Sequence, residues 1–98
     1  MEKFTICVIY QAKSEKDRGL FVRELTDSGI LDLIRNEAGC LRYEYFNAVE
    51  DQKKLVLLEE WENKACQELH MTQPHMKSVM EIKGKYIEKA ELKQIKII

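Results

Sequence analysis

The order of the predicted elements indicates an α+β fold of the ferredoxin-like type, a four-stranded antiparallel sheet with its helices on one face. Four segments alternate with the period of a strand, and the segments between them carry helix caps and apolar stripes. Their order is strand, helix, strand, strand, helix, strand. The 98 residues contain no repeat or linker, so residues 1–98 are expected to form a single domain.

The first strand and the helix after it are marked by clear patterns. Residues 4–11 are rich in β-branched and aromatic side chains, and both faces of this strand are largely apolar. Ser14, followed three residues later by an acidic residue, is a candidate helix cap. The apolar stripes of residues 20–25 and 30–34 are out of phase by nearly half a turn. We therefore expect the helix to break between them, near Gly29.

A hairpin is predicted in the middle of the chain. Strands over residues 40–46 and 53–61 flank a short polar turn at residues 49–52. Strict alternation in the first strand places Leu41 on the same face as Tyr43. In the second strand, one face carries Leu55, Leu57, Glu59 and Trp61.

A second helical region follows the hairpin. Asn63 is a suitable N-cap, and we expect Ala65 and Leu69 on the inward side of this helix. Pro74 disfavours helical geometry at the residue before it, so the helix should end near Met71.

A further helix and a last strand complete the order. The helix is expected to be capped by Thr72, to carry Pro74 in its first turn and to end at Gly84. Its expected inward residues are Met76, Val79, Met80 and Ile82. The last strand is expected over residues 86–93.

The uncovered face of this sheet predicts a homodimer. Helices on one face leave the other face bare, although several strands are apolar on both sides. In a monomer this face would be a large exposed apolar patch, which a second copy packed sheet against sheet removes. The apolar tail formed by Ile95, Ile97 and Ile98 is a candidate to reach across to the partner.

Charge and cysteine content narrow the class of protein. A net charge of -1 argues against a nucleic-acid or membrane-surface module, and no apolar run is long enough to cross a bilayer. No signal sequence is recognisable at the N-terminus, so we expect a cytoplasmic protein. The 3 cysteines are an odd number without a C-x-x-C spacing, which argues against a disulfide framework. Cys66, close to His70, is the best candidate for a reactive thiol.

Three short elements, taken in order, resemble the antibiotic biosynthesis monooxygenase family. They are Glu37-Ala38-Gly39-Cys40-Leu41-Arg42-Tyr43, then Glu59-Glu60-Trp61, then His70-Met71-Thr72-Gln73-Pro74-His75. The resemblance covers nearly the whole chain. It implies a dimeric α/β barrel with a pocket in each subunit between the sheet and the helices.

The same resemblance leaves the reaction open. The family includes oxygenases that act on phenolic or quinol-type compounds without metal or flavin, using O2. It also includes haem-degrading enzymes and a relative that isomerises a phosphorylated autoinducer sugar. Haem is disfavoured here because the first strand has no Asn and neither histidine clearly occupies the axial place. We therefore expect no cofactor.

His70 is the first candidate for catalysis. An imidazole can take or give a proton near neutral pH. Removing a proton from a quinol makes an anion that can pass one electron to O2 and couple with it, and removing one beside a carbonyl would drive an isomerase. A histidine that only makes a local hydrogen bond is the alternative. Trp61 is the second catalytic candidate, although packing in the core would explain it equally.

Three further residues are candidates for substrate binding. His75 is five residues after His70, about 140° around a helix, so the two rings are expected to diverge and we expect no metal site. Glu59 lies on an apolar face and needs a partner, for which Arg42 or His70 is plausible, or else it lines the pocket. Tyr43 would form a pocket wall.

Three functions therefore remain in view. The first is a cofactor-independent monooxygenase with His70 as general base. The second is an isomerase of a small phosphorylated carbonyl metabolite that uses the same base. The third is a non-catalytic dimer that binds a small ligand.

Overall fold

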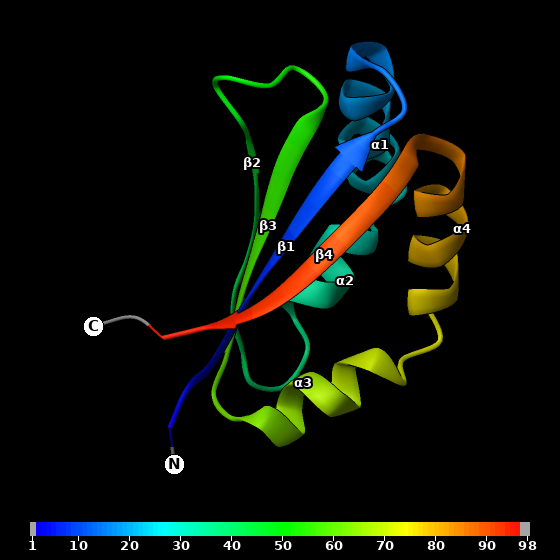
Figure 1. Ribbon diagram of the computed structural model, residues 1–98. Coiled ribbons are helices and arrows are strands. Elements are labelled where there is room, and N and C mark those ends of the chain that lie inside the picture. Colours follow the sequence, from blue (N-terminus) through cyan, green and yellow to red (C-terminus); the bar gives the residue numbers. More distant parts are fainter. Residues whose placement is uncertain (1, 97–98) are drawn as a thin grey trace.

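The computed structural model describes residues 2–96 as eight elements. The elements are β1 (Phe4–Ala12), α1 (Glu15–Asp27), α2 (Ile30–Arg35), β2 (Cys40–Asn47), β3 (Lys54–Trp61), α3 (Lys64–Met71), α4 (Met76–Tyr86) and β4 (Ile87–Ile95). The strands form one antiparallel sheet in the order β2-β3-β1-β4, and the helices lie on one side of it (Figure 1). The predicted ferredoxin-like α+β fold is confirmed.

The predicted break in the first helical region is present. Ser14 caps α1 by accepting a 3.0 Å hydrogen bond from the backbone N–H of Asp17. Gly29 then takes a φ of 80°, a left-handed conformation that favours glycine, and α2 starts at the next residue. Because the axis changes there, both apolar stripes reach the sheet: Phe21 of α1 and Ile34 of α2 are fully buried.

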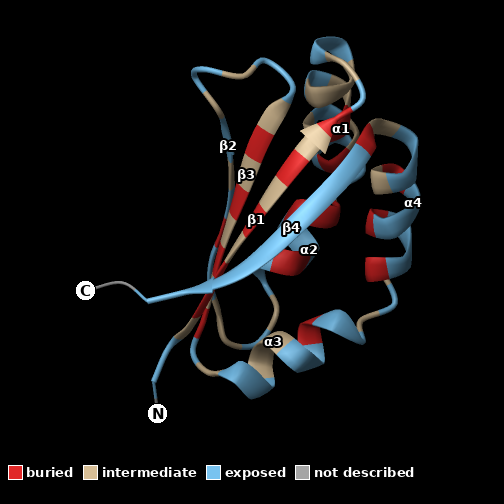
Figure 2. Ribbon diagram, viewed as in Figure 1, coloured by how far each residue is buried: buried red, intermediate tan, exposed pale blue. Residues whose placement is uncertain are grey.

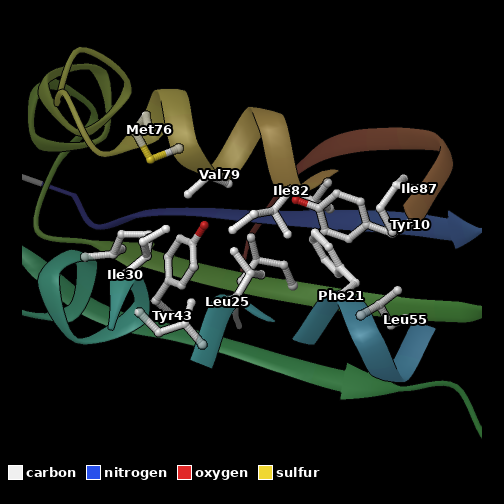
Figure 3. Close-up of a cluster of buried hydrophobic side chains, with 14 of the residues drawn as sticks. Tyr10, Phe21, Leu25, Ile30, Tyr43, Leu55, Met76, Val79, Ile82 and Ile87 are labelled. Atoms are coloured by element: carbon white, nitrogen blue, oxygen red, sulfur yellow. The ribbon is translucent and has the colours of Figure 1, made fainter. Parts of the chain in front are cut away.

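The core fills the space between the sheet and α1, α2 and α4. Figure 3 shows side chains from these helices meeting Tyr10, Tyr43 and Leu55 from the sheet. Along β3, buried residues that point inward alternate with partly exposed residues that point outward (Figure 2). Burial of this apolar layer supplies most of the stabilisation of a small domain.

A β-bulge in β2 corrects the predicted orientation of Leu41. Cys40 pairs with Trp61 and Arg42 with Glu60, so Leu41 is an extra residue in its strand. Its side chain is 46% exposed, whereas that of Tyr43 is buried. Strict alternation would have kept these two residues on the same face.

The second helical region departs from the predictions in its details. α3 ends at Met71 as expected, but Thr72 is its C-cap, and α4 starts only at Met76, after Pro74. α4 also continues through Gly84 to Tyr86. α4 starts late because the chain first turns around Pro74. It passes Gly84 because this glycine does not adopt the positive φ that would end a helix.

Two more predictions for this region are corrected. Met80 was expected inside but is 57% exposed, because Val79 and Ile82 form the inward stripe of α4. The last strand, β4, is shifted to Ile87–Ile95, and its residues after the first are exposed in the single chain (Figure 2).

None of the four described helices covers the other face of the sheet (Figure 1). Its central residues, Cys7, Ile9, Val56 and Leu58, are only partly covered. Ile95 ends β4 and is 36% exposed, while Ile97 and Ile98 lie outside the described residues. Within residues 2–96, no helix combines the length and the hydropathy needed to span a bilayer.

Candidate active site

His70 points into the protein from the last turn of α3. Its side chain is 1% exposed, whereas its neighbour Leu69 is 55% exposed. The helix is therefore rotated from the predicted orientation, in which Ala65 and Leu69 faced inward; Ala65 is exposed too. An imidazole, and not an aliphatic side chain, is the buried residue of this helix.

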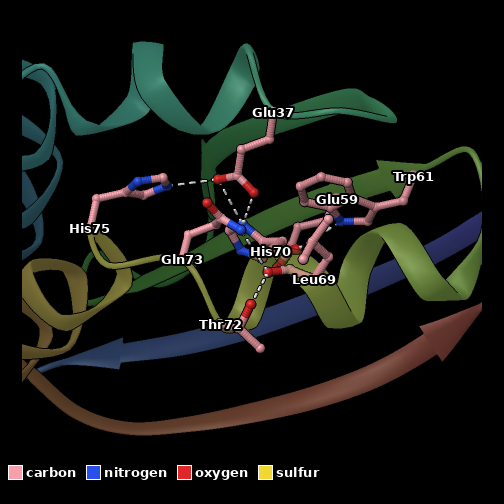
Figure 4. Close-up of polar contacts among 8 residues, drawn as sticks. All are labelled: Glu37, Glu59, Trp61, Leu69, His70, Thr72, Gln73 and His75. Atoms are coloured by element: carbon pink, nitrogen blue, oxygen red, sulfur yellow. Dashed lines mark hydrogen bonds and ion pairs between the residues drawn. The ribbon is translucent and has the colours of Figure 1, made fainter.

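Glu37 connects the two histidines, as Figure 4 shows. Nδ1 of His70 lies 3.0 Å from Oε1 and 3.1 Å from Oε2 of Glu37. Nε2 of His75 lies 2.7 Å from the same Oε2. The prediction that the two rings diverge is wrong, because the chain turns between α3 and α4 and brings both rings to one carboxylate.

Sequence reasoning missed Glu37 as a site residue. In the sequence, Glu37 stands out only as the first residue of a family motif. Glu37 lies 33 residues before His70 in the sequence, and its carboxylate meets the His70 ring only because the α2–β2 loop and α3 pack together. No local spacing in the sequence reports this contact.

The loop that carries Glu37 is held by its backbone. The N–H of Glu37 donates to the carbonyl of Ile34 over 3.0 Å, and the N–H of Cys40 donates to the carbonyl of Glu37 over 3.1 Å. Gly39 has a φ of 80°, and a Cβ atom at this position would collide with Sγ of Cys66 in α3. The absence of a side chain at residue 39 therefore allows α3 to approach the loop closely.

Glu59 is buried without a basic partner. It accepts a 3.1 Å hydrogen bond at Oε1 from Nε1 of Trp61. Neither predicted partner reaches it, because Arg42 binds Glu44 over 2.7 Å and His70 binds Glu37. Burial raises the pKa of the Glu59 carboxyl to about 7, partly opposed by the hydrogen bond from Trp61. Such a carboxyl can hold or release a proton near neutral pH.

Aromatic rings enclose the buried imidazole. The centroid of His70 is 4.7 Å from that of the Trp61 ring, at an interplanar angle of 34°. The Tyr43 ring contacts it from β2 at 5.7 Å and 61°. Burial raises the pKa of the Tyr43 phenol well above its usual value, so this hydroxyl stays protonated at neutral pH.

All five predicted site residues thus lie in one connected cluster. The ring of His70 contacts the rings of Trp61 and Tyr43 directly, and Trp61 donates a hydrogen bond to Glu59. His75 joins through Glu37 and is more exposed, with 18% of its side chain accessible. Within residues 2–96, no group of three or more His, Cys, Asp or Glu side chains is arranged to hold a metal ion.

Two open hollows lie elsewhere on the molecule. One of about 680 Å³ is lined by residues that include Thr5, Glu60 and Ile95, on the helix-free side of the sheet. Another of about 240 Å³ is lined by residues that include Ile9 and Gln11. The predicted site residues line neither of these hollows, and they pack against one another.

Comparison with known proteins identifies the family of this chain. The family model described as antibiotic biosynthesis monooxygenase matches residues 5–82. Among curated protein sequences, no match is found.

Solved structures agree with the fold. A protein from Pseudomonas aeruginosa has a TM-score of 0.82 and 21% identity, over 100% of this chain and 96% of that one. A protein from Methanosarcina mazei has a TM-score of 0.82 and 22% identity, over 98% and 93%. A structure named antibiotic biosynthesis monooxygenase has a TM-score of 0.74 and 19% identity, over 97% and 98%. With the family model covering most of its length, the chain belongs to the antibiotic biosynthesis monooxygenase family.

Proposed function

We propose that this protein is a monooxygenase that oxidises a small phenolic or quinol-type compound with O2, without a cofactor. The supporting observation is the buried ring of His70, held by Glu37 at Nδ1 and flanked by Trp61 and Tyr43. In the proposed reaction, the neutral ring donates from Nδ1 to the Glu37 carboxylate and keeps a lone pair at Nε2. That nitrogen is the general base of the proposed reaction.

The reaction balances without metal or flavin. Nε2 takes a proton from the substrate, and the resulting anion passes one electron to O2. The substrate radical and superoxide then combine to form a carbon–oxygen bond. The ring carbon that forms this bond then carries one hydrogen and a hydroperoxide, and loss of water leaves a carbonyl there, so O2 supplies one oxygen to the product and one to water. The substrate itself supplies every electron.

The charges around His70 favour a neutral aromatic substrate over a phosphorylated one. The side chains shown to contact its ring belong to Trp61, Tyr43 and Glu37, and the buried carboxyl of Glu59 is next to Trp61. These groups are aromatic or acidic. A phosphate dianion near the carboxylate of Glu37 would be repelled, whereas a planar ring can stack on an indole. This argument ranks the oxygenase above the sugar-phosphate isomerase.

Binding requires the cluster to open. Trp61 and His70 are at most 1% exposed and Tyr43 is 3% exposed, so a substrate reaches Nε2 only when side chains or α3 move. α3 is suited to this movement, because His70 is its one buried residue. In this proposal Trp61 and Tyr43 form the pocket walls, and Glu59 and His75 are the polar groups that orient the ligand.

A second copy of the chain is the proposed partner. The helix-free face has an apolar centre of Cys7, Ile9, Val56 and Leu58. Lys93 pairs with Glu91 on one edge of the sheet and Arg42 with Glu44 on the other. A patch with both signs of charge around an apolar centre can be complementary to itself across a two-fold axis.

Oxygen consumption tests the proposed function. We expect the wild-type protein to consume one O2 per molecule of a suitable quinol, and His70→Gln to lower the rate by about 100-fold or more. Glutamine can still bond to Glu37, so the packing should survive. Leu69→Ala is the matched control on the exposed side of α3, with an unchanged rate.

Other results would reject the proposal. Equal rates in the wild type and His70→Gln would remove His70 as the base. Conversion of a phosphorylated sugar without O2 would identify an isomerase. Tight binding of a quinol with no O2 uptake would identify a ligand-binding dimer.

A further inference from the structure

Glu37, His70 and His75 come from three separate segments and meet at one carboxylate. Glu37 lies in the loop between α2 and β2. His70 lies in the last turn of α3 and points inward, and His75 immediately precedes α4. We propose that Glu37 is a positioning residue that keeps the proton of neutral His70 on Nδ1, with His75 holding the carboxylate from its other side. This inference rests on the proposed function, in which Nε2 of His70 is the base.

The hydrogen-bond geometry supports this role. Both carboxylate oxygens of Glu37 lie within 3.1 Å of Nδ1 of His70, and neither oxygen can donate when ionised. A neutral imidazole has one N–H, so its other nitrogen, Nε2, is left with a lone pair. Without such an acceptor, a neutral imidazole can carry its proton on either nitrogen, and only one of these forms has Nε2 as a base.

Packing against Trp61 and Tyr43 keeps the imidazole of His70 from flipping by half a turn. The Trp61 ring lies 4.7 Å from the imidazole and the Tyr43 ring lies 5.7 Å from it, measured between centroids. A flip of the imidazole by half a turn would direct a carbon at Glu37 and would need space between these two rings. The orientation is therefore fixed by contacts on the faces as well as at Nδ1.

His75 fixes the position of the carboxylate. Its Nε2 lies 2.7 Å from Oε2 of Glu37, the shortest contact in the cluster, and the Glu37 side chain is 11% exposed. With ring nitrogens on two sides, the carboxylate cannot rotate away from His70 without losing a hydrogen bond. This assigns His75 a role toward Glu37 in addition to any contact with a ligand.

The other titratable groups near this cluster do not compete for Nδ1. Glu59 of β3 accepts from Trp61, and Tyr43 of β2 remains a neutral phenol because burial raises its pKa. The thiol of Cys40, at the start of β2, also has a raised pKa, from burial and from the charge of Glu37. Among these groups, Glu37 is the one that binds the imidazole.

The position of the proton on His70 can be measured directly. In protein labelled with ¹⁵N-histidine, two-bond ¹⁵N–¹H spectra at pH 8 distinguish the two neutral forms of each ring. We expect His70 in the wild type to be protonated at Nδ1 and unprotonated at Nε2. In Glu37→Gln, whose amide can also donate, we expect the population of the Nε2–H form to rise about tenfold.

His75→Gln is the matched control. Glutamine can still donate to Oε2 of Glu37, so His70 should keep its proton on Nδ1. A wild-type ring protonated at Nε2 would overturn the inference, and so would a Glu37→Gln ring that stays wholly in the Nδ1–H form. If Glu37→Gln does not fold, the wild-type spectrum still decides which nitrogen carries the proton.

This test is independent of turnover. The spectra are recorded without substrate or O2, so the expected proton position together with no O2 uptake would reject only the proposed function. O2 uptake that depends on His70, together with a proton on Nε2, would reject only the role of Glu37.

Discussion

Trp61 and Glu59 leave the same face of β3, and the indole Nε1–H of Trp61 donates to the Glu59 carboxyl over 3.1 Å. This hydrogen bond lowers the pKa of Glu59, whereas burial raises it to about 7. We predict that Trp61→Phe, which removes the donor and keeps an aromatic ring, moves the pKa of Glu59 above 7. A ¹³C titration of the carboxyl group measures it. An unchanged pKa would show that another group stabilises the carboxylate.

Glu59 should make the folded protein less stable as pH rises. Its pKa is about 7 in the folded state against an ordinary value of 4.5, so the folded state binds this proton more tightly. The contribution of the protonated carboxyl to the free energy of unfolding is complete below pH 4.5 and is lost as pH rises through about 7. This contribution is about 3 kcal/mol. Urea denaturation at pH 4.5 and pH 8 measures the difference.

Glu59→Gln is the reference for that experiment. Glutamine can still accept from Trp61 but does not titrate, so the difference in unfolding free energy between the two proteins isolates residue 59. We expect the wild type to lose stability relative to Glu59→Gln between these two pH values. Parallel behaviour of the two proteins would contradict the raised pKa.

Two glycines should respond in opposite directions to alanine. At Gly39, φ is 80° and a Cβ atom would collide with Sγ of Cys66, so Gly39→Ala should destabilise the protein by about 2 kcal/mol or more. At Gly84, within α4, a Cβ atom meets nothing within 4 Å, so Gly84→Ala should stabilise it by about 0.5 kcal/mol. Urea midpoints of both variants check this, and equal effects would refute it.

The proposed dimer predicts a change of mass in solution. Ile9 lies at the centre of the helix-free face, so Ile9→Asp should convert a dimer into a monomer in sedimentation velocity. Val49→Asp, at a position 98% exposed in the hairpin loop, is the control and should remain dimeric. A wild-type protein that sediments as a monomer at micromolar concentration would contradict the proposal.

The strands and the first helical break could be predicted from the sequence because each depends on local pattern. Alternation over β3 correctly separated Leu57 and Glu59 from Leu58, and the phase change near Gly29 correctly marked the end of α1. These features depend on residues close together in the chain, where the periods of helix and strand apply directly.

The candidate site was harder to predict, since it depends on how distant segments pack. The apolar pattern of α3 favoured Leu69 as its inward residue, yet the partner of His70 is Glu37, which is far away in the sequence. A buried polar pair reverses the usual preference for an aliphatic side chain. Helical periodicity treats polar residues as outward-facing and therefore gives the wrong rotation.

The extra residue in β2 has a consequence for insertions and deletions. Without Leu41, Cys40 and Arg42 would be consecutive opposite Trp61 and Glu60, and the ladder would be regular. A one-residue deletion at position 41 would therefore leave Tyr43 facing inward, whereas one at Glu44 would turn the rest of the strand over. Homologous chains one residue shorter at this point can keep the same interior.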